Sequence, residues 1–304
     1  MKRSYVGYLL VAFILCVATA CADTSRDRVV VLAASSLSDA FQEMELAFEA
    51  VNPTIDVQLN LAGSSSLREQ IFDGAPADVF ASASELTMQQ VVAKVGVARE
   101  AQPFATNALT IVTPAENPAE ITEIRDLARD DILVGLCAAE VPCGMFARDA
   151  LAQAGVQASI DTDEPNVRSL LGKIIAGELD AGIVYTSDVS GPARQPESLQ
   201  PQTMQPQSLQ PETLQPQTMQ PQTMQPETLQ PESLQPQTMQ PETMQPQTMQ
   251  VQTIALPDNV DVEIVYPIAE LNEAANSSGA QAFVSFVLST EGQSILATYG
   301  FGSP

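Results

Sequence analysis

A buried strand that runs directly into a helix is encoded near the start of the chain, in residues 28–41. Valines fill positions 29–31, the apolar run ends at Ser35 and Ser36, and an amphipathic pattern begins there. This pattern predicts a strand followed by a helix, with Ser36 as the N-cap and Asp39 completing a capping-box-like turn. Because a helix N-terminus exposes unpaired N–H groups and a partial positive charge, such a turn is suited to bind an anion.

The same strand-then-helix order recurs along the chain. Residues 54–61 alternate as a strand and run into Gly63 and Ser64, and a helical pattern follows from Leu67; residues 74–82 form a turn and a short strand. Further strands are expected at 107–113, 131–136, 182–185, 251–256 and 262–271, and further helices at 121–129, 142–154, 167–175, 280–288 and 290–299. This alternation predicts an α/β fold, with a parallel sheet covered by helices on both faces.

A low-complexity tract interrupts this pattern. From Gln195 to Met249 the chain consists of eleven tandem pentapeptides of the form Gln-Pro-(Gln/Glu)-(Thr/Ser)-(Met/Leu). Proline at every fifth position removes helix donors and excludes a central strand. One apolar residue in five buries too little surface to offset the entropy of ordering. We therefore predict a disordered or polyproline-like loop inserted into the folded part of the chain.

The N-terminus has the features of an export signal. Lys2 and Arg3 precede a short apolar run at 8–20, which is followed by Cys21 and polar residues. Residues 1–20 are therefore predicted to be a signal peptide. The residues before Cys21 are similar to a bacterial lipobox, which predicts a lipid anchor on Cys21; ordinary secretion and an uncleaved anchor are the alternatives.

Charge and composition exclude several function classes. The net charge is −24 and the chain contains no histidine. Nucleic-acid binding needs basic patches, and a histidine-based catalytic triad or a histidine-ligated metal cannot form. An anionic ligand is still compatible with the charge, because long-range fields are screened within about 8–10 Å at physiological salt.

Two cysteines remain after the signal and the lipobox. Cys137 and Cys143 are six positions apart. In an exported protein this pair predicts a local disulfide, and two unpaired buried thiols are the alternative. The spacing is not that of a CxxC redox motif.

Several turns join the end of a strand to the start of a helix. They lie at residues 34–36, 63–65, 141–143 and 165–167, and Tyr185 adds a phenol at the end of another strand. In open α/β sheets, ligands bind outside the carboxyl ends of the strands, where such turns gather. Hydroxyls and free backbone N–H groups suit a desolvated oxyanion held by neutral hydrogen bonds. For any one serine alone, simple helix capping is the alternative.

These motifs also carry a family resemblance. The chain resembles the periplasmic molybdate-binding proteins (ModA-type) of bacterial molybdate ABC transporters over about residues 29–302, apart from the repeat tract. The matching segments are 33–41, 63–67, 74–82, 107–109, 141–144, 166–168, 182–188 and 299–301.

The resemblance implies a two-lobed type II periplasmic binding protein fold, with the ligand in the cleft between the lobes. Lobe 1 would comprise residues 28–106 and 268–304. Lobe 2 would comprise residues 107–267, interrupted by the repeat tract at 195–249.

The resemblance also implies a ligand shell. Two serines, two backbone amides and one tyrosine hold the anion in this family, and by motif position they fall on Ser36, Ser64, the N–H groups of Cys143 and Val167, and the Tyr185 hydroxyl. Cys143 stands where alanine is frequent, and only its N–H would be used.

The implied function is extracytoplasmic binding of molybdate, and also tungstate, by a monomer that delivers it to a separate membrane permease. No cofactor and no enzymatic activity are expected; a serine hydrolase would need a histidine base or a Gly-x-Ser-x-Gly elbow, and both are missing. The alternatives are binding of another tetrahedral oxyanion such as sulfate, and a surface spacer or adhesin-like role of the repeats. The protein is expected to be lipid-anchored at the cell membrane, facing the periplasm or the exterior.

Overall fold

The structure is a computed structural model that describes residues 27–191 and 251–304. The predicted signal peptide, Cys21 and the repeat tract at 195–249 lie outside the described residues, so the expectations for them remain predictions. Within the described ranges, no helix is both long enough and apolar enough to cross a membrane.

The first of two sheets has five strands in the order β2-β1-β3-β10-β4. Their bounds are β1 Asp27–Ala34, β2 Ile55–Ala62, β3 Val79–Ala81, β4 Gln102–Asn107 and β10 Ile264–Glu270. Strand β1 pairs in parallel with β2 and β3, whereas β10 is antiparallel to both β3 and β4.

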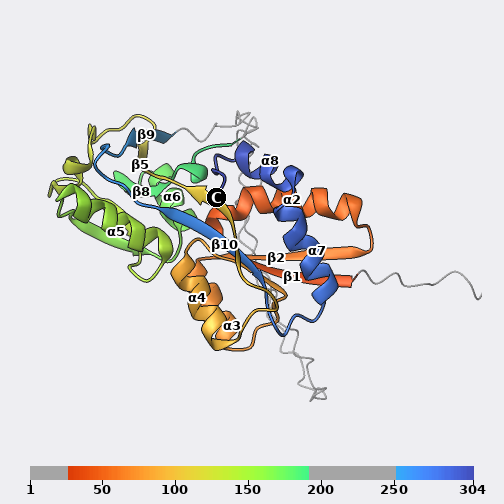
Figure 1. The fold of residues 1–304 in the computed structure, drawn as a ribbon. Coiled ribbons are helices and arrows are strands. Elements are labelled where there is room, and N and C mark those ends of the chain that lie inside the picture. The colour runs from red at the N-terminus through yellow and green to blue at the C-terminus, as the bar shows by residue number, and fades with distance from the viewer. Residues whose placement is uncertain (1–26, 192–250) are drawn as a thin grey trace, which may run out of the picture. The chain divides into compact units, whose positions relative to one another are not determined.

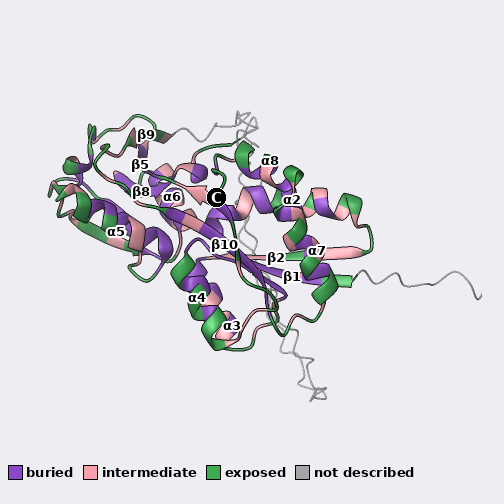
Figure 2. Ribbon diagram, in the orientation of Figure 1, coloured by how far each residue is buried: buried purple, intermediate pink, exposed green. Residues whose placement is uncertain are grey.

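Helices cover both faces of this sheet (Figure 1). They are α2 (Ser38–Val51), α7 (Ser277–Val287) and α8 (Thr290–Thr298) on one face, and α3 (Ser64–Phe72) and α4 (Glu85–Lys94) on the other. Along β1, Val29 and Val31 pack in the large core, whereas Leu32 packs in a smaller core with residues of α3 and α4. Burial on both faces explains the continuous apolar run of this strand, and Figure 2 shows β1 and β10 buried along most of their length.

An aromatic cluster fixes α2 and α7 against the first sheet. Phe283 on α7 lies edge-on to Phe48 and Phe41 on α2, with ring centroids 5.3 and 6.0 Å apart. Phe41 also contacts Phe104 of β4 at 6.0 Å. Such pairs add about 0.5–1.5 kcal/mol each beyond the area they bury, so the turn before α2 is held on a rigid base.

The second sheet also has five strands, in the order β7-β6-β8-β5-β9. Its elements are β5 Leu109–Pro114, β6 Val134–Cys137, β7 Ile160–Glu164, β8 Ala181–Tyr185 and β9 Val251–Ala255, with helices α5 Pro142–Ala154 and α6 Val167–Ile175 packed against it. Strand β6 is parallel to β7 and β8, and β5 is antiparallel to β8 and β9.

The chain passes between the two sheets twice. It leaves the first sheet between Asn107 and Leu109, and it returns in residues 256–263, between β9 and β10. Strand β10 therefore runs across the lobe boundary that the family resemblance implies between residues 267 and 268. We propose that the two crossings themselves divide the lobes.

Most predicted elements are present, and the two helices behind the proposed amide donors have the predicted bounds, 142–154 and 167–175. The expectation of a parallel sheet is wrong in part, because the strands at the crossings pair antiparallel and make both sheets mixed. Residues 121–129 do not form an α-helix: only a 3₁₀ turn exists at 124–128, closed by reciprocal capping between Glu123 and Asp126.

The strands β4 and β7 and the α-helix α4 were not predicted from the sequence. Pro267 lies within β10, which pairs with β3 on one side and β4 on the other. The register of β10 shifts between Tyr266 and Pro267, and this bulge accommodates a residue that lacks an N–H donor.

Candidate functional site

A small cavity lies where four strand-to-helix turns meet. Its free volume is about 10 Å³, room for roughly one water molecule. It is lined by Ala34, Ser35, Ser36, Gly63, Ser64, Ala83, Val141, Pro142, Cys143, Val167 and Tyr185. The fold thus brings together all five predicted ligand residues, Ser36, Ser64, Cys143, Val167 and Tyr185; the two serines come from the first sheet and the other three from the second.

Ser36 does not cap the helix, so this part of the prediction is wrong. A 3₁₀ turn at Ser35–Leu37 separates β1 from α2, the N-cap position of α2 is Leu37, and no side chain caps it. Because Ser36 lies inside this turn, its Oγ is free to reach across and lies 3.0 Å from the Tyr266 hydroxyl. Asp39 does not complete a capping box either, and instead pairs with Arg168.

Ser64 is the first residue of α3 and is almost completely buried. Its Oγ accepts a hydrogen bond from the Ala83 N–H at 3.0 Å. This contact uses an acceptor position of the hydroxyl and leaves its proton available to the cavity.

The second sheet contributes the first turns of two helices. Cys143 follows Pro142, the first residue of α5, and Val167 is the first residue of α6. Asn166 caps α6, because its side chain accepts the Ser169 N–H at 3.0 Å. The first N–H groups of a helix have no intrahelical carbonyl partner, so the Cys143 and Val167 amides are suited to donate to an anion.

Tyr185 ends β8, and its side chain is buried. The Tyr266 ring lies 6.0 Å from it, yet the Tyr185 hydroxyl has no hydrogen bond of normal geometry within the described residues. Burial raises the pKa of Tyr185 well above its ordinary value, so this hydroxyl stays protonated at physiological pH. A buried donor without a partner is unusual and fits a position reserved for a ligand.

The cavity wall contains no charged side chain. Arg168 contacts a residue of the cavity wall: its Nε donates to the Ser35 carbonyl at 3.1 Å, and its Nη2 lies 2.8 Å from Asp39 Oδ2. Arg168 belongs to α6 and Asp39 to α2, so this pair joins the two halves of the site. Sequence reasoning did not assign it a role.

Gly63 lets the two halves approach closely. A Cβ added to Gly63 would lie 2.7 Å from the Pro165 carbonyl oxygen, which belongs to the turn before α6. The backbone of Gly63 is in the ordinary extended region, with φ −60° and ψ 136°. Glycine is therefore needed here for space and not for its conformational freedom.

A disulfide joins Cys137 at the end of β6 to Cys143 in α5, with Cα atoms 5.7 Å apart. Both residues are buried. The bond closes the short turn that presents the Cys143 amide, and Arg148 further fixes this turn by donating from Nη1 to the Cys137 carbonyl at 2.6 Å.

Reduction of this disulfide is expected to lower the free energy of unfolding by about 2 kcal/mol. The intact bond closes a short loop and so restricts the unfolded chain, and reduction removes this restriction and makes unfolding more favourable. Urea unfolding with and without a dithiol reductant measures the difference. The Cys137→Ala, Cys143→Ala double variant serves as the control and should be insensitive to the reductant. Equal stability of the oxidised and reduced wild-type protein would contradict the expectation.

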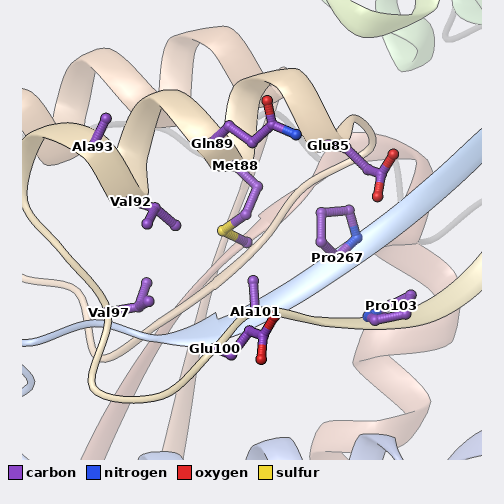
Figure 3. Close-up of a pocket in the computed structure, with 10 residues that line it drawn as sticks. All are labelled: Glu85, Met88, Gln89, Val92, Ala93, Val97, Glu100, Ala101, Pro103 and Pro267. Atoms are coloured by element: carbon purple, nitrogen blue, oxygen red, sulfur yellow. The ribbon is translucent and has the colours of Figure 1, made fainter.

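A second pocket lies on the first sheet, between α4 and strands β4 and β10 (Figure 3). Met88 and Val92 of α4 and Val97 give it an apolar lining, and two carboxylates, Glu85 and Glu100, border it. It shares no residue with the serine-lined cavity. An anion would be repelled by the carboxylates and would find few donors, so the smaller cavity is the candidate site. Within the described residues, no group of three or more Cys, Asp or Glu side chains is placed to hold a metal ion.

Comparison with known proteins identifies the family of the chain and several relatives. Residues 29–302 match the family model for bacterial extracellular solute-binding proteins. A molybdate-binding protein ModA of Mycobacterium tuberculosis is 42% identical over 161 residues, covering 53% of this chain and 61% of that protein. A ModA of Haemophilus influenzae is 30% identical over 170 residues, covering 53% of this chain and 67% of that protein. The chain thus spans somewhat over half the length of the mycobacterial relative.

Solved structures share the fold. The periplasmic molybdate-binding protein of Azotobacter vinelandii aligns with a TM-score of 0.64 at 16% identity, over 91% of this chain and 99% of that one. The sulfate-binding protein SubI of M. tuberculosis aligns with a TM-score of 0.65 at 17% identity, over 91% and 86% of the two chains. The fold class predicted from the sequence is confirmed, and the chain belongs to the bacterial extracellular solute-binding protein family.

Proposed function

We propose that this protein binds molybdate, and also tungstate, outside the cytoplasm and delivers it to the membrane permease of an ABC transporter. The observation that carries the proposal is the buried Tyr185 hydroxyl, which lacks a partner within the described residues and lines a cavity together with Ser36 and Ser64. The ModA relatives support molybdate as the ligand.

The ligand shell we propose consists only of neutral donors. The hydroxyls of Ser36, Ser64 and Tyr185 and the N–H groups of Cys143 and Val167 would surround the anion. A hydrogen bond to a charged group is worth about 1.5–3 kcal/mol, so five such donors bind a dianion firmly without a counter-charge. The two halves of the site would close over the ligand and exclude water, and opening at the permease would release it.

Location and assembly complete the proposal. Membership of an extracellular family agrees with export, and we infer that the mature protein is a monomer anchored by a lipid on Cys21. The permease is a separate chain. The protein acts as a binding protein and not as an enzyme, and it needs no cofactor.

Sulfate is the second candidate ligand, because a sulfate-binding protein shares the fold and neutral donors also suit sulfate. Titration calorimetry of the purified mature protein with molybdate, tungstate, sulfate and phosphate separates the two. We expect tight binding of molybdate and tungstate and little heat from the other two anions. Sulfate binding equal to or stronger than molybdate binding would refute the assignment.

A further inference from the structure

The disulfide between Cys137 and Cys143 lies directly beside the anion-binding cavity, because one of its two cysteines belongs to the cavity wall. Cys143 contributes its sulfur to the bond and, in the proposed ligand shell, its backbone N–H to the anion. Cys137 ends β6 and is not among the residues that line the cavity. A change at the bond therefore reaches the anion site through Cys143.

The backbone around this bond is tightly packed. A Cβ added to Gly144 would collide with the carbonyl oxygens of Cys137 and Ala138, so the first turn of α5 lies directly on the backbone that ends β6. Arg148 holds this contact together, since its Nη1 donates to the carbonyls of Cys137 and Gly144, at 2.6 and 3.1 Å. Because closely packed interiors transmit strain, a shift of the Cys143 side chain moves its own backbone amide as well.

Reduction would give the Cys143 sulfur a different partner. Its Sγ lies 3.8 Å from the Ile183 carbonyl oxygen on β8, and a thiol carries a proton that this oxygen can accept, whereas a disulfide sulfur does not. Two thiols also need more room than a disulfide, because sulfurs that are not bonded to each other cannot approach as closely. Both effects draw Cys143 toward β8 and away from Cys137. Both cysteines are buried, so little space is left to absorb this movement elsewhere.

We propose that Cys137 is a positioning residue that holds the Cys143 amide in place through the disulfide, and that anion binding and the redox state of this bond are in consequence coupled. This rests on the proposed function, since the Cys143 N–H has to be a ligand donor. The oxidised protein binds the anion more tightly than the dithiol form. Because such coupling is reciprocal, the bound anion stabilises the disulfide against reduction by the same factor.

The redox step is thiol–disulfide exchange with a monothiol such as glutathione. One glutathione thiolate attacks a protein sulfur and forms a mixed disulfide, and the other protein sulfur leaves as a thiolate. A second glutathione thiolate attacks the mixed disulfide, which releases the remaining protein sulfur and oxidised glutathione. The protein gains two electrons, and its two sulfurs take up two protons.

Calorimetry of the full-length mature protein in its two redox states is the first test. The protein is reduced, the reductant is removed by gel filtration without oxygen, and molybdate is then titrated. We expect the reduced protein to bind about tenfold more weakly, the low end for the loss of one hydrogen bond to a charged ligand. The Cys137→Ala variant keeps Cys143 as a thiol and leaves the cavity wall unchanged. It should bind as weakly as the reduced protein, with or without prior reduction.

The midpoint of reduction is a readout that a purely structural role of the disulfide would not move. Free thiols are counted by mass spectrometry after alkylation, in buffers of varied glutathione ratio, with and without saturating tungstate. Tungstate is the anion here because it resists reduction by thiols better than molybdate does. A tenfold coupling lowers the midpoint potential by about 30 mV. The control is the Ser36→Ala, Ser64→Ala double variant, in which the same tungstate concentration should shift the midpoint much less.

Equal affinity in the two redox states, or a midpoint that tungstate does not shift, would show that the disulfide stabilises the fold but does not position the amide. Tighter binding by the reduced protein would also overturn the inference. Failure of the proposed function is a separate result, visible in the oxidised wild-type protein. If that protein prefers sulfate to molybdate, the molybdate assignment is wrong, and both measurements repeated with sulfate still test the coupling.

Discussion

Replacing both Ser36 and Ser64 by alanine is expected to reduce molybdate affinity by at least about a hundredfold. Each substitution removes one hydroxyl that the structure leaves ready to donate, and a hydrogen bond to a charged ligand is worth about 1.5–3 kcal/mol. The ligand's oxygens would also remain buried without their donors in the closed site. Titration calorimetry of the double variant measures the loss directly, with the single variants showing whether the two contributions add.

The matched control is the Ser65→Ala, Ser66→Ala double variant. Both serines lie in α3 directly after Ser64, and neither lines the cavity. Its affinity should equal that of the wild-type protein, with a small change in stability at most. If the Ser36 and Ser64 double variant binds molybdate normally while its fold is intact, the anion site lies elsewhere in the molecule.

Gly63→Ala is expected to weaken molybdate binding by about 2.5 kcal/mol, close to a hundredfold, without touching the ligand. The new Cβ would lie 2.7 Å from the Pro165 carbonyl oxygen, and a backbone atom in a tight turn cannot move aside as a flexible side chain can. Overpacking of this kind costs typically about 1–3 kcal/mol. Because the clash exists only when the two halves meet, it acts on the closed form and hence on affinity.

Stability in the absence of ligand separates this mechanism from simple misfolding. The midpoint of thermal unfolding of ligand-free Gly63→Ala should stay near that of the wild-type protein, since the backbone angles of residue 63 suit alanine. Gly172→Ala provides the control, because its added Cβ meets nothing within 4 Å and it lies inside α6. It should stabilise the protein by up to about 1 kcal/mol and leave affinity unchanged. Loss of folding in Gly63→Ala, or unaltered affinity, would contradict the closure argument.

The site residues at strand-to-helix turns could be predicted from the sequence, because helix starts are marked by particular residue types in the first turn. Pro142 and Asn166 mark the starts of α5 and α6 through the chemistry of the first helical turn, and both helices begin where predicted. Tyr185 was placed correctly at the end of its strand. Their convergence on one cavity follows from the fold, which the family resemblance supplied.

Residues that act through distant contacts carried no comparable signal. Tyr266 is 230 positions from Ser36, and Arg168 is 133 positions from Ser35. Tyr266 sits in an apolar strand where an aromatic residue is most simply explained as core. Ser36 failed as a predicted cap for a related reason: its hydroxyl bonds to this distant partner, and local patterning does not reveal that a 3₁₀ turn intervenes. The antiparallel strands at the crossings were missed because hydrophobic runs do not encode direction.

The ion pair between Arg168 and Asp39 makes ionic strength a kinetic variable for this protein. Each side chain is about one-fifth exposed, so added salt should screen the pair, favour opening and shorten the residence time of the anion. The same salt weakens the repulsion between a chain of net charge −24 and an approaching dianion, which speeds capture. Salt would therefore accelerate exchange in both directions while changing the equilibrium affinity much less than either rate.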